Sequence, residues 1–263
     1  MQHSALSEVL AMKERGEKIA MLTAYDAVFA RLLSDAGTDV LLVGDSLGML
    51  VQGEADTLSV RLSETAYHVR CVRAGATKAV VIGDMPFGTY QQSPERAYAN
   101  AAKLMAAGAT MIKMEGGKLF AETIEFLTAR GIPVCAHAGL MPQWVRAQGG
   151  YKVRGRDDNE AASICEDTTA LEEAGAAMLV LELVPAKVAA KITDSLRIPV
   201  IGIGSGVKCD GQVLVTHDML GMTGAPKRFV RNFMSDGGGI QEAVASYVAA
   251  VKSGEFPAAE NSF

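Results

Sequence analysis

Residues 39–45, DVLLVGD, show the pattern that decides the fold of this chain. Four consecutive apolar residues are followed by a glycine and then by Asp45. A run this short and this uniformly apolar is typical of a parallel strand that is buried on both faces. Similar runs, each ending in Gly, Asp, Glu or His, occur at residues 18–26, 79–84, 110–115, 132–139, 177–182, 198–206 and 212–218.

Stretches with the apolar spacing of amphipathic helices separate these runs. They cover residues 59–74, 94–107, 119–129, 160–174 and 185–195. In the second of them, Ser93 is a natural N-cap, Pro94 stands at the first helical position, and Gly108 follows the end. The chain therefore alternates between expected strands and expected helices.

Eight such strands in 263 residues predict an α/β protein with a (β/α)8 TIM-barrel fold. We expect one domain over residues 1–263, with an N-terminal helix and a helical tail at residues 229–234 and 240–251. An open, doubly wound sheet is the alternative. No Gly-x-Gly-x-x-Gly motif opens the first crossover, which weakens a dinucleotide-binding interpretation.

Composition and charge narrow the class of protein further. With 49% hydrophobic and 21% charged residues, the chain has an ordinary globular composition. The net charge of −5 argues against a protein that coats nucleic acid. The four cysteines form no Cys-x-x-Cys motif and are expected to be reduced thiols, so we expect a cytoplasmic protein. No signal peptide is recognisable, and no apolar run approaches 18 residues, so no membrane association is expected.

Polar side chains stand where the expected strands end. A TIM barrel carries its chemistry at the carboxyl ends of its strands, so these side chains should converge on one mouth. They are Asp45, Ser46, Asp84, Lys113, Glu115, His137 and Glu182.

Four acids at one mouth would repel one another, and a bound divalent cation would relieve that repulsion. Oxygen ligands without cysteine or paired histidine favour Mg²⁺ or Mn²⁺ over Zn²⁺. The competing interpretation is that each acid caps the helix that follows its strand, as acids in this position often do.

Lys113 and Glu115 are two residues apart, so both should point to the same side of their strand. A lysine beside a metal-bound acid suits an anionic substrate group, although a salt-bridged barrel lysine would look the same in sequence. His137 either supports the metal ligands from behind or is a hydrogen-bonded core residue.

Two loops have a composition that suits anions. Residues 202–206, GIGSG, follow a late strand, where barrel loops often bind phosphate, although the glycines also permit a tight turn. Residues 141–158 form a long, locally basic loop, which is either an anion-attracting lid or a solvated surface loop. Its cationic residues are Arg146, Lys152, Arg154 and Arg156.

Motifs over nearly the whole chain resemble the ketopantoate hydroxymethyltransferase family. They are LTAYD (22–26), LLVGDSLGMLVQG (41–53), GDMPFGTY (83–90), IKMEGG (112–117), HAGLMPQ (137–143), GGYKVRGR (149–156), LVLELVP (179–185) and IGIGSG (201–206). The combination, in this order, is far more specific than any single motif.

The resemblance implies a (β/α)8 barrel of the phosphoenolpyruvate/pyruvate superfamily. It further implies one Mg²⁺ per subunit, 5,10-methylenetetrahydrofolate as co-substrate, a role in pantothenate biosynthesis, and assembly as a homo-oligomeric ring, a decamer or an octamer. The substrates it implies are the small 2-oxo acid 3-methyl-2-oxobutanoate and the folate.

Matched motif by motif, the resemblance assigns roles to the strand-end residues. It implies that Asp45, Asp84 and Glu115 bind the metal, and that Ser46 and Lys113, together with Asp45 and Asp84, contact the 2-oxo acid. It also implies that Glu182 is the proton acceptor.

Two other functions remain open at this point. One is a Mg²⁺-dependent lyase or mutase of the same superfamily, acting on another 2-oxo acid. Such enzymes typically need a reactive loop cysteine, and Cys209 lies in a loop without the surrounding motif. The other is a barrel without catalysis, in which Glu182 would have no chemical role.

Overall fold

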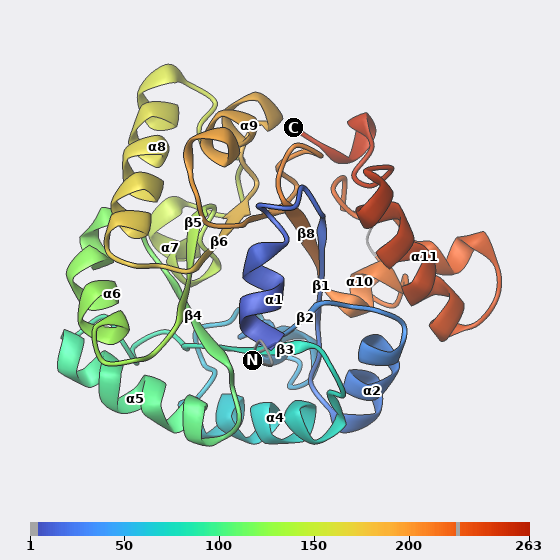
Figure 1. Cartoon of the computed structure of the whole chain (residues 1–263), viewed down its shortest axis with the longest axis horizontal. Helices are drawn as coiled ribbons and strands as arrows, with labels where there is room; N and C mark the ends of the chain where they lie inside the picture. Colours follow the sequence, from blue (N-terminus) through green and yellow to red (C-terminus); the bar gives the residue numbers. More distant parts are fainter. Residues whose placement is uncertain (1–4, 225–226) are drawn as a thin grey trace.

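The fold is a closed barrel, as expected from the alternation of strands and helices. The computed structural model describes residues 5–224 and 227–263, and within them eight parallel strands pair in sequence order, with β1 closing on β8 (Figure 1). The strands are β1 (Ile19–Thr23), β2 (Val40–Val43), β3 (Val80–Asp84), β4 (Met111–Glu115), β5 (Val134–Gly139), β6 (Met178–Glu182), β7 (Val200–Ile203) and β8 (Gly211–Leu214). This confirms the prediction of a (β/α)8 barrel and excludes the open sheet.

Helices surround the barrel. The helices predicted between the strands are α4 (Leu62–Gly75), α5 (Pro94–Ala106), α6 (Ala121–Thr128), α8 (Asp158–Glu173) and α9 (Ala186–Ser195), and the predicted N-terminal helix and the helix of the tail are also present. The others are α1 (Ala5–Ala11), α2 (Ala27–Asp35), α3 (Leu47–Leu50), α7 (Val145–Gln148), α10 (Thr216–Met219) and α11 (Ile240–Ser253). Four short 3-10 turns complete the described chain: η1 (Lys118–Phe120), η2 (Pro142–Trp144), η3 (Phe233–Asp236) and η4 (Ala259–Asn261).

Local signals in the sequence explain where α5 and α2 begin. The Ser93 side chain accepts a hydrogen bond from the Arg96 N–H at 3.2 Å, and Pro94 is the first residue of α5, as predicted. Asp26 caps α2 by accepting from the N–H groups of Val28 and Phe29. Asp26 is the last residue of the strand predicted over residues 18–26, and α2, which it caps, was not predicted.

Side chains alternate between two cores along each strand. In β1, Ile19 and Met21 point into the barrel, whereas Ala20 and Leu22 pack outward against the helices. This period of two is the geometry of a strand buried on both faces. It decides which strand-end residues face the barrel mouth.

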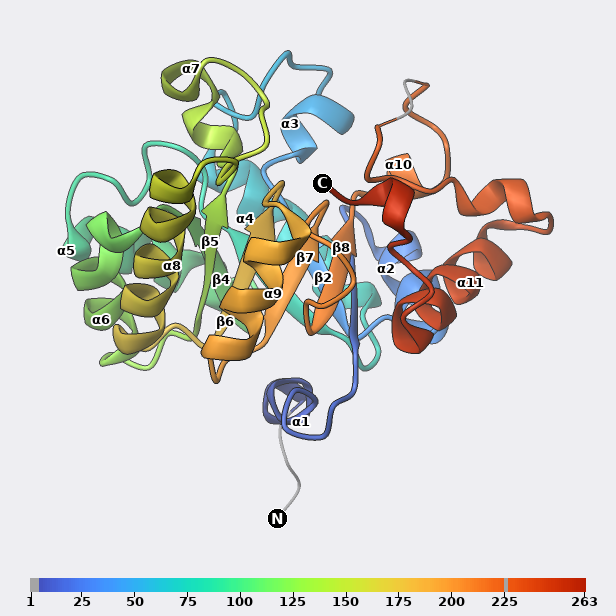
Figure 2. The same ribbon diagram turned by 90° about the horizontal axis from the view of Figure 1, so that it is seen from above.

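The two ends of the barrel are closed differently. Helix α1 lies across the amino-terminal end of the strands, where Val9 and Met12 join the interior core (Figure 2). The short helices α3 and α7 lie beyond the opposite end, above the mouth. Among the described helices, none combines the length and apolar composition needed to cross a membrane.

The C-terminal tail differs in part from the prediction. Helix α11 is present, but residues 229–232 form no helix, and only the turn η3 follows. The prediction of a helix over 229–234 was therefore wrong. Phe229 instead lines the cavity at the mouth, and the Asn232 side chain accepts from Met234 N to begin η3. These tertiary and capping contacts outweigh the local helical pattern.

Candidate active site

Strand alternation carries the predicted polar residues to one place. Asp84, Glu115 and Glu182 each continue the inward-facing row of their own strand. They stand two residues after Ile82, Lys113 and Val180, respectively. His137 continues the row of Cys135 in β5. All of these side chains therefore enter the mouth of the barrel from its wall.

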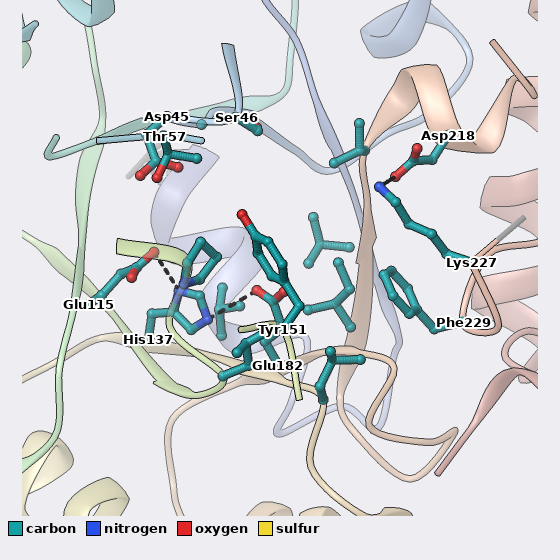
Figure 3. A pocket seen from close by; sticks show the side chains of 18 of the residues that line it. Asp45, Ser46, Thr57, Glu115, His137, Tyr151, Glu182, Asp218, Lys227 and Phe229 are labelled. Atoms are coloured by element: carbon teal, nitrogen blue, oxygen red, sulfur yellow. Dashed lines mark hydrogen bonds and ion pairs between the residues drawn. The ribbon is translucent and has the colours of Figure 1, made fainter. Parts of the chain in front are cut away.

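A cavity of about 850 Å³ occupies the mouth (Figure 3). All seven predicted strand-end residues line it: Asp45, Ser46, Asp84, Lys113, Glu115, His137 and Glu182. The predicted lid contributes Tyr151, Lys152 and Arg156 to the same cavity. The structure thus brings together residues that are up to 137 positions apart in sequence.

Lys113 is held among the acids. Its Nζ lies 2.7 Å from Asp84 Oδ2 and 3.7 Å from Glu115 Oε1, and the backbone N–H of Asp45 donates to Asp84 Oδ2 at 3.3 Å. Burial alone would lower the pKa of Lys113, but the carboxylates of Asp84 and Glu115 raise it, so this side chain stays cationic. Lys113 is both a salt-bridged barrel lysine and a fixed positive charge on the cavity wall.

The cluster carries more negative than positive charge. Four carboxylates, those of Asp45, Asp84, Glu115 and Glu182, face two cationic groups, Lys113 and His137, which leaves two negative charges in excess when all are ionised. Burial, together with the neighbouring Asp84 and Glu115, raises the pKa of Asp45 to about 8. Burial likewise raises the pKa of Asp84, although Lys113 opposes the shift.

His137 connects two acids on either side of it (Figure 3). Its Nδ1 lies 3.4 Å from Glu115 Oε1, and its Nε2 lies 3.3 Å from Glu182 Oε2. Burial and Lys113 would lower the pKa of His137, but these two carboxylates raise it to about 9. The same contacts, with Lys113, outweigh the effect of burial on Glu115 and lower the pKa of that carboxyl. His137 is therefore a buried cation paired with two acids.

The backbone around Glu182 is tightly constrained. Leu183, the next residue, has a φ of 48°, and it is the one non-glycine residue with positive φ in the described chain. Its N–H donates to Ile203 O at 2.9 Å. Gly139 on the neighbouring strand has a φ of 90°, and a Cβ there would lie 2.3 Å from Glu182 O. Only glycine permits this approach, and the turn aims Glu182 into the cavity.

None of the four acids caps a following helix. The N-cap positions of α3, α5 and α9 are Ser46, Ser93 and Pro185, and that of η1 is Gly117. The alternative interpretation, that each acid caps the helix after its strand, is therefore wrong for these four residues. Helix capping does not explain why they converge.

The carboxylates at the mouth are oxygen donors of the kind that a divalent cation requires. Within residues 5–224 and 227–263, no three His, Cys, Asp or Glu side chains form a ready-made metal cage. Mg²⁺, however, commonly uses only one or two protein carboxylates together with water and substrate oxygens. Two buried oxygens accept no hydrogen bond: Asp84 Oδ1, and Glu115 Oε1, which lies 3.4 Å from His137 Nδ1 and 3.7 Å from Lys113 Nζ. Together with the excess negative charge, these oxygens fit a hydrated divalent cation.

The loop after β7 serves the fold. The Ser205 hydroxyl, fully buried, donates to Leu181 O at 2.8 Å and accepts from Val184 N at 3.2 Å. Gly206 lies against Ala186, where a Cβ would approach the alanine Cβ to 2.6 Å. Of the two interpretations of GIGSG, the tight-turn one accounts for these contacts.

The loop over residues 141–158 lies over the mouth and contacts the segment after β2. Arg146 pairs with Asp56 at 2.9 Å, and Arg154 pairs with Glu160 at 2.6 Å. Tyr151 is half exposed, and its hydroxyl is 4.0 Å from Met49 Sδ. Lys152 and Arg156 line the cavity, so the positive charge that the lid offers to a ligand comes from them.

Two further groups of residues belong to the site and were not predicted from the sequence. Gln143 and Tyr90 are buried behind the acids and hydrogen-bond to them. On the opposite wall, Phe229 lies beside an ion pair between Asp218 and Lys227, whose charged atoms are 2.7 Å apart (Figure 3). No strand-end pattern marks Gln143 or Lys227, because both lie in loops.

Solved structures with a similar fold come from enzymes of varied chemistry. A phosphonopyruvate hydrolase in complex with oxalate and Mg²⁺ superimposes with a TM-score of 0.64 at 16% identity, over 96% of both chains. An oxaloacetate acetylhydrolase in complex with 3,3-difluorooxalacetate gives 0.61 at 15% identity, over 97% of this chain and 98% of that one. At such identities the likeness establishes the fold alone.

Sequence relatives are much closer. The 3-methyl-2-oxobutanoate hydroxymethyltransferase of Thiobacillus denitrificans is 58% identical over 258 residues, 98% of each chain. The enzyme of that name from Neisseria meningitidis is 59% identical over 253 residues, 96% of each chain. Residues 3–259 match the family model described as ketopantoate hydroxymethyltransferase. The chain therefore belongs to the ketopantoate hydroxymethyltransferase family.

Proposed function

We propose that this enzyme transfers a one-carbon unit from 5,10-methylenetetrahydrofolate to 3-methyl-2-oxobutanoate. Overall, the reaction consumes water and yields 2-dehydropantoate and tetrahydrofolate, as the first step of pantothenate biosynthesis. The family supports the reaction, and one observation in the structure supports it most directly. His137 contacts Glu115 on one side and Glu182 on the other, so the carboxylate of Glu182 is held on the cavity wall one imidazole away from Glu115.

Glu182 is suited to accept the C3 proton of the 2-oxo acid. Its side chain is 15% exposed and lines the cavity, so its carboxylate can reach a bound substrate. The pair with His137 and the turn at Leu183 restrict its position. A well-placed carboxylate base contributes roughly 10²- to 10⁴-fold to such a proton transfer. C3 then forms a bond to the one-carbon unit, water supplies the hydroxyl group on that carbon, and both of its bonds to folate nitrogens break. The two nitrogens of the departing tetrahydrofolate take up the remaining proton of the water and the proton removed from C3.

The acids and Lys113 bind the other end of the substrate. Asp45, Asp84 and Glu115 would hold Mg²⁺, which when bound supplies Lewis-acid polarisation of the C2 carbonyl and charge neutralisation. Lys113 contributes a fixed positive charge for the substrate carboxylate, and the Ser46 hydroxyl, hydrogen-bonded to Tyr25 at 2.8 Å, faces the same cavity. With Asp45 and Asp84, these groups position the 2-oxo acid so that C3 faces Glu182.

The folate is assigned to the outer part of the cavity. Lys152 and Arg156 lie on the lid side of the mouth, and they suit the anionic glutamate tail of a folate. Enclosure beneath the lid would also keep bulk water from the reactive intermediates.

Turnover of purified protein tests the proposal. We expect consumption of 3-methyl-2-oxobutanoate only when 5,10-methylenetetrahydrofolate is present, and loss of that activity after chelation, with recovery on addition of Mg²⁺. Activity that persists without folate, or that survives complete removal of divalent ions, would contradict it.

A lyase or mutase reaction on another 2-oxo acid is the competing function. Cys209, the loop cysteine that this alternative would use, is fully buried, and its thiol faces Ser205 O at 3.8 Å rather than the cavity. Burial raises the pKa of this thiol to about 11. These observations favour the transferase.

Three further properties follow from family membership and are proposed with it. The enzyme is cytoplasmic, uses Mg²⁺ as its metal, and assembles as a homo-oligomeric ring, a decamer or an octamer. Light scattering on the eluted protein would measure the subunit number, and a monomer at micromolar concentration would contradict the ring.

A further inference from the structure

Gln143 ties the beginning of the lid to the acid cluster. It lies in η2, directly after β5, and its side chain is buried although it belongs to a loop. It is not one of the residues that line the cavity, yet it contacts two that do. A buried side-chain amide is stable only when its polar atoms are hydrogen-bonded, so the partners of Gln143 indicate its role.

Two groups of Gln143 reach two different acids. The side-chain Nε2 donates to Asp45 Oδ2 at 2.9 Å, and the backbone N–H donates to Glu115 Oε2 at 3.0 Å. Asp45 follows β2 and Glu115 ends β4, so a single residue bridges acids from two separate strands. The bridge determines where these carboxylates stand relative to each other.

The orientation of the amide is fixed by its surroundings. Nε2 also donates to Met85 O at 2.9 Å, and a carbonyl can only accept, so the nitrogen must face this side. Oε1 accepts from the Tyr90 hydroxyl at 2.8 Å and from Gln91 Nε2 at 3.3 Å. Both donors and both acceptor positions of the amide are used. Gln143 therefore has no hydrogen-bonding group left for a substrate, and it acts through the acids it holds.

Tyr90 supports the same arrangement from behind. Its hydroxyl, fully buried, accepts from the backbone N–H of Glu115 at 3.1 Å while contacting Gln143 Oε1. The end of β4 is thus gripped at its backbone by Tyr90 and at its carboxylate by Gln143.

We propose that Gln143, oriented by Tyr90, is a positioning residue that sets the spacing of the Asp45 and Glu115 carboxylates for a divalent cation and the 2-oxo acid. The inference rests on the proposed function in that the acids are taken to be the metal ligands. Partners that orient metal ligands from behind typically contribute 10- to 100-fold, by order of magnitude, to metal affinity or activity.

Two substitutions of similar size test the role of the amide. Gln143→Met keeps the volume but removes every polar contact of the side chain. Gln143→Glu keeps the shape but turns an acceptor toward Asp45 Oδ2 and Met85 O, which repels both. We expect the dissociation constant for Mn²⁺, measured by electron paramagnetic resonance without keto acid or folate, to rise roughly 10- to 100-fold.

A matched control and a milder variant separate positioning from general destabilisation. Gln212 is also a buried glutamine, and its Nε2 donates to Gly206 O at 3.0 Å, away from the acids. Gln212→Met should lower the melting temperature with little change in Mn²⁺ affinity. Tyr90→Phe leaves Gln143 in place but removes the hydroxyl that bonds both Gln143 Oε1 and the backbone of Glu115. It should therefore weaken Mn²⁺ binding roughly 5- to 30-fold, the contribution of one to two neutral hydrogen bonds. This variant answers the question if the Gln143 variants do not fold.

The outcomes are distinct. Unchanged Mn²⁺ affinity in folded Gln143 variants, or in Tyr90→Phe if they do not fold, overturns the inference, as does an equal loss of affinity in Gln212→Met. A wild-type protein that binds no Mn²⁺ overturns it too. If the wild type binds Mn²⁺, the Gln143 variants bind it weakly, and no folate-dependent turnover is seen, then the positioning role stands and the proposed reaction fails.

Discussion

The Nε2 atom of His137 lies 3.3 Å from Oε2 of Glu182, and this pair links the two halves of the site. Strand register accounts for it, because His137 pairs with Glu115 on one side of β5, while Gly139, two residues on, pairs with Glu182 on the other. One imidazole is therefore placed between an acid of the proposed metal site and the proposed base. The carboxylate of Glu182 is oriented before any substrate arrives.

Replacing Glu182 by glutamine should stop proton transfer while keeping the fold. The amide retains the shape of the side chain but cannot accept the C3 proton, so we expect kcat to fall by roughly 10²- to 10⁴-fold with a smaller change in KM. In the absence of folate, exchange of the C3 proton of the 2-oxo acid with deuterated water should also cease, as NMR would show. Exchange at the wild-type rate would rule out Glu182 as the base, whereas a wild-type protein that catalyses neither exchange nor turnover would support the barrel without catalysis.

Asp84→Asn should abolish metal-dependent activity without unfolding the protein. The amide has no negative charge, so it loses the ion pair with Lys113 at 2.7 Å. It also removes the anionic oxygen Asp84 Oδ1, which has no hydrogen-bond partner and is available to a cation. Mn²⁺ titration and circular dichroism would measure the two effects separately. Normal Mn²⁺ affinity together with retained turnover would contradict the assignment of Asp84 as a ligand.

The basic lid should affect the folate and not the 2-oxo acid. Of the four cationic residues in this loop, Arg146 and Arg154 are paired with Asp56 and Glu160, whereas Lys152 and Arg156 line the cavity. We expect Arg156→Ala and Lys152→Ala to raise the KM for folate several-fold, by the loss of about 1 kcal/mol or less per screened charge contact. Arg154→Ala is the comparison variant. An unchanged folate KM in both cavity-lining variants would end the idea.

The cysteines should differ sharply in reactivity. All four are free thiols, but Cys135 and Cys209 are buried, and burial raises the pKa of the first to about 12 and of the second to about 11. Because the thiolate is the reactive form, iodoacetamide at pH 8 should label the partly exposed Cys71 and Cys165 first. Peptide mass spectrometry would read the order, with the denatured protein as control. Rapid labelling of Cys209 with loss of activity would revive the lyase alternative.

The alternation of apolar runs and glycine-terminated helices was sufficient to predict the barrel. A strand buried on both faces must be apolar at nearly every position, so β2 and β3 are visible as short runs without any tertiary information. The prediction was wrong at residues 229–234, where Phe229 lines the cavity instead of continuing a helix. It missed α2, because Asp26 looks like a strand end and is in fact a helix cap.

By itself, the sequence determined the fold class and the rows of inward-facing side chains, since both depend on a period of two that any buried strand must obey. It placed Asp84, Glu115, His137 and Glu182 at strand ends for the same reason. Only the tertiary structure decided which polar groups meet. The bridge from Gln143 to Asp45 spans 98 residues and begins in a loop. Loop residues have no periodicity, so their partners are decided by how the barrel closes and by the need to satisfy every buried donor and acceptor.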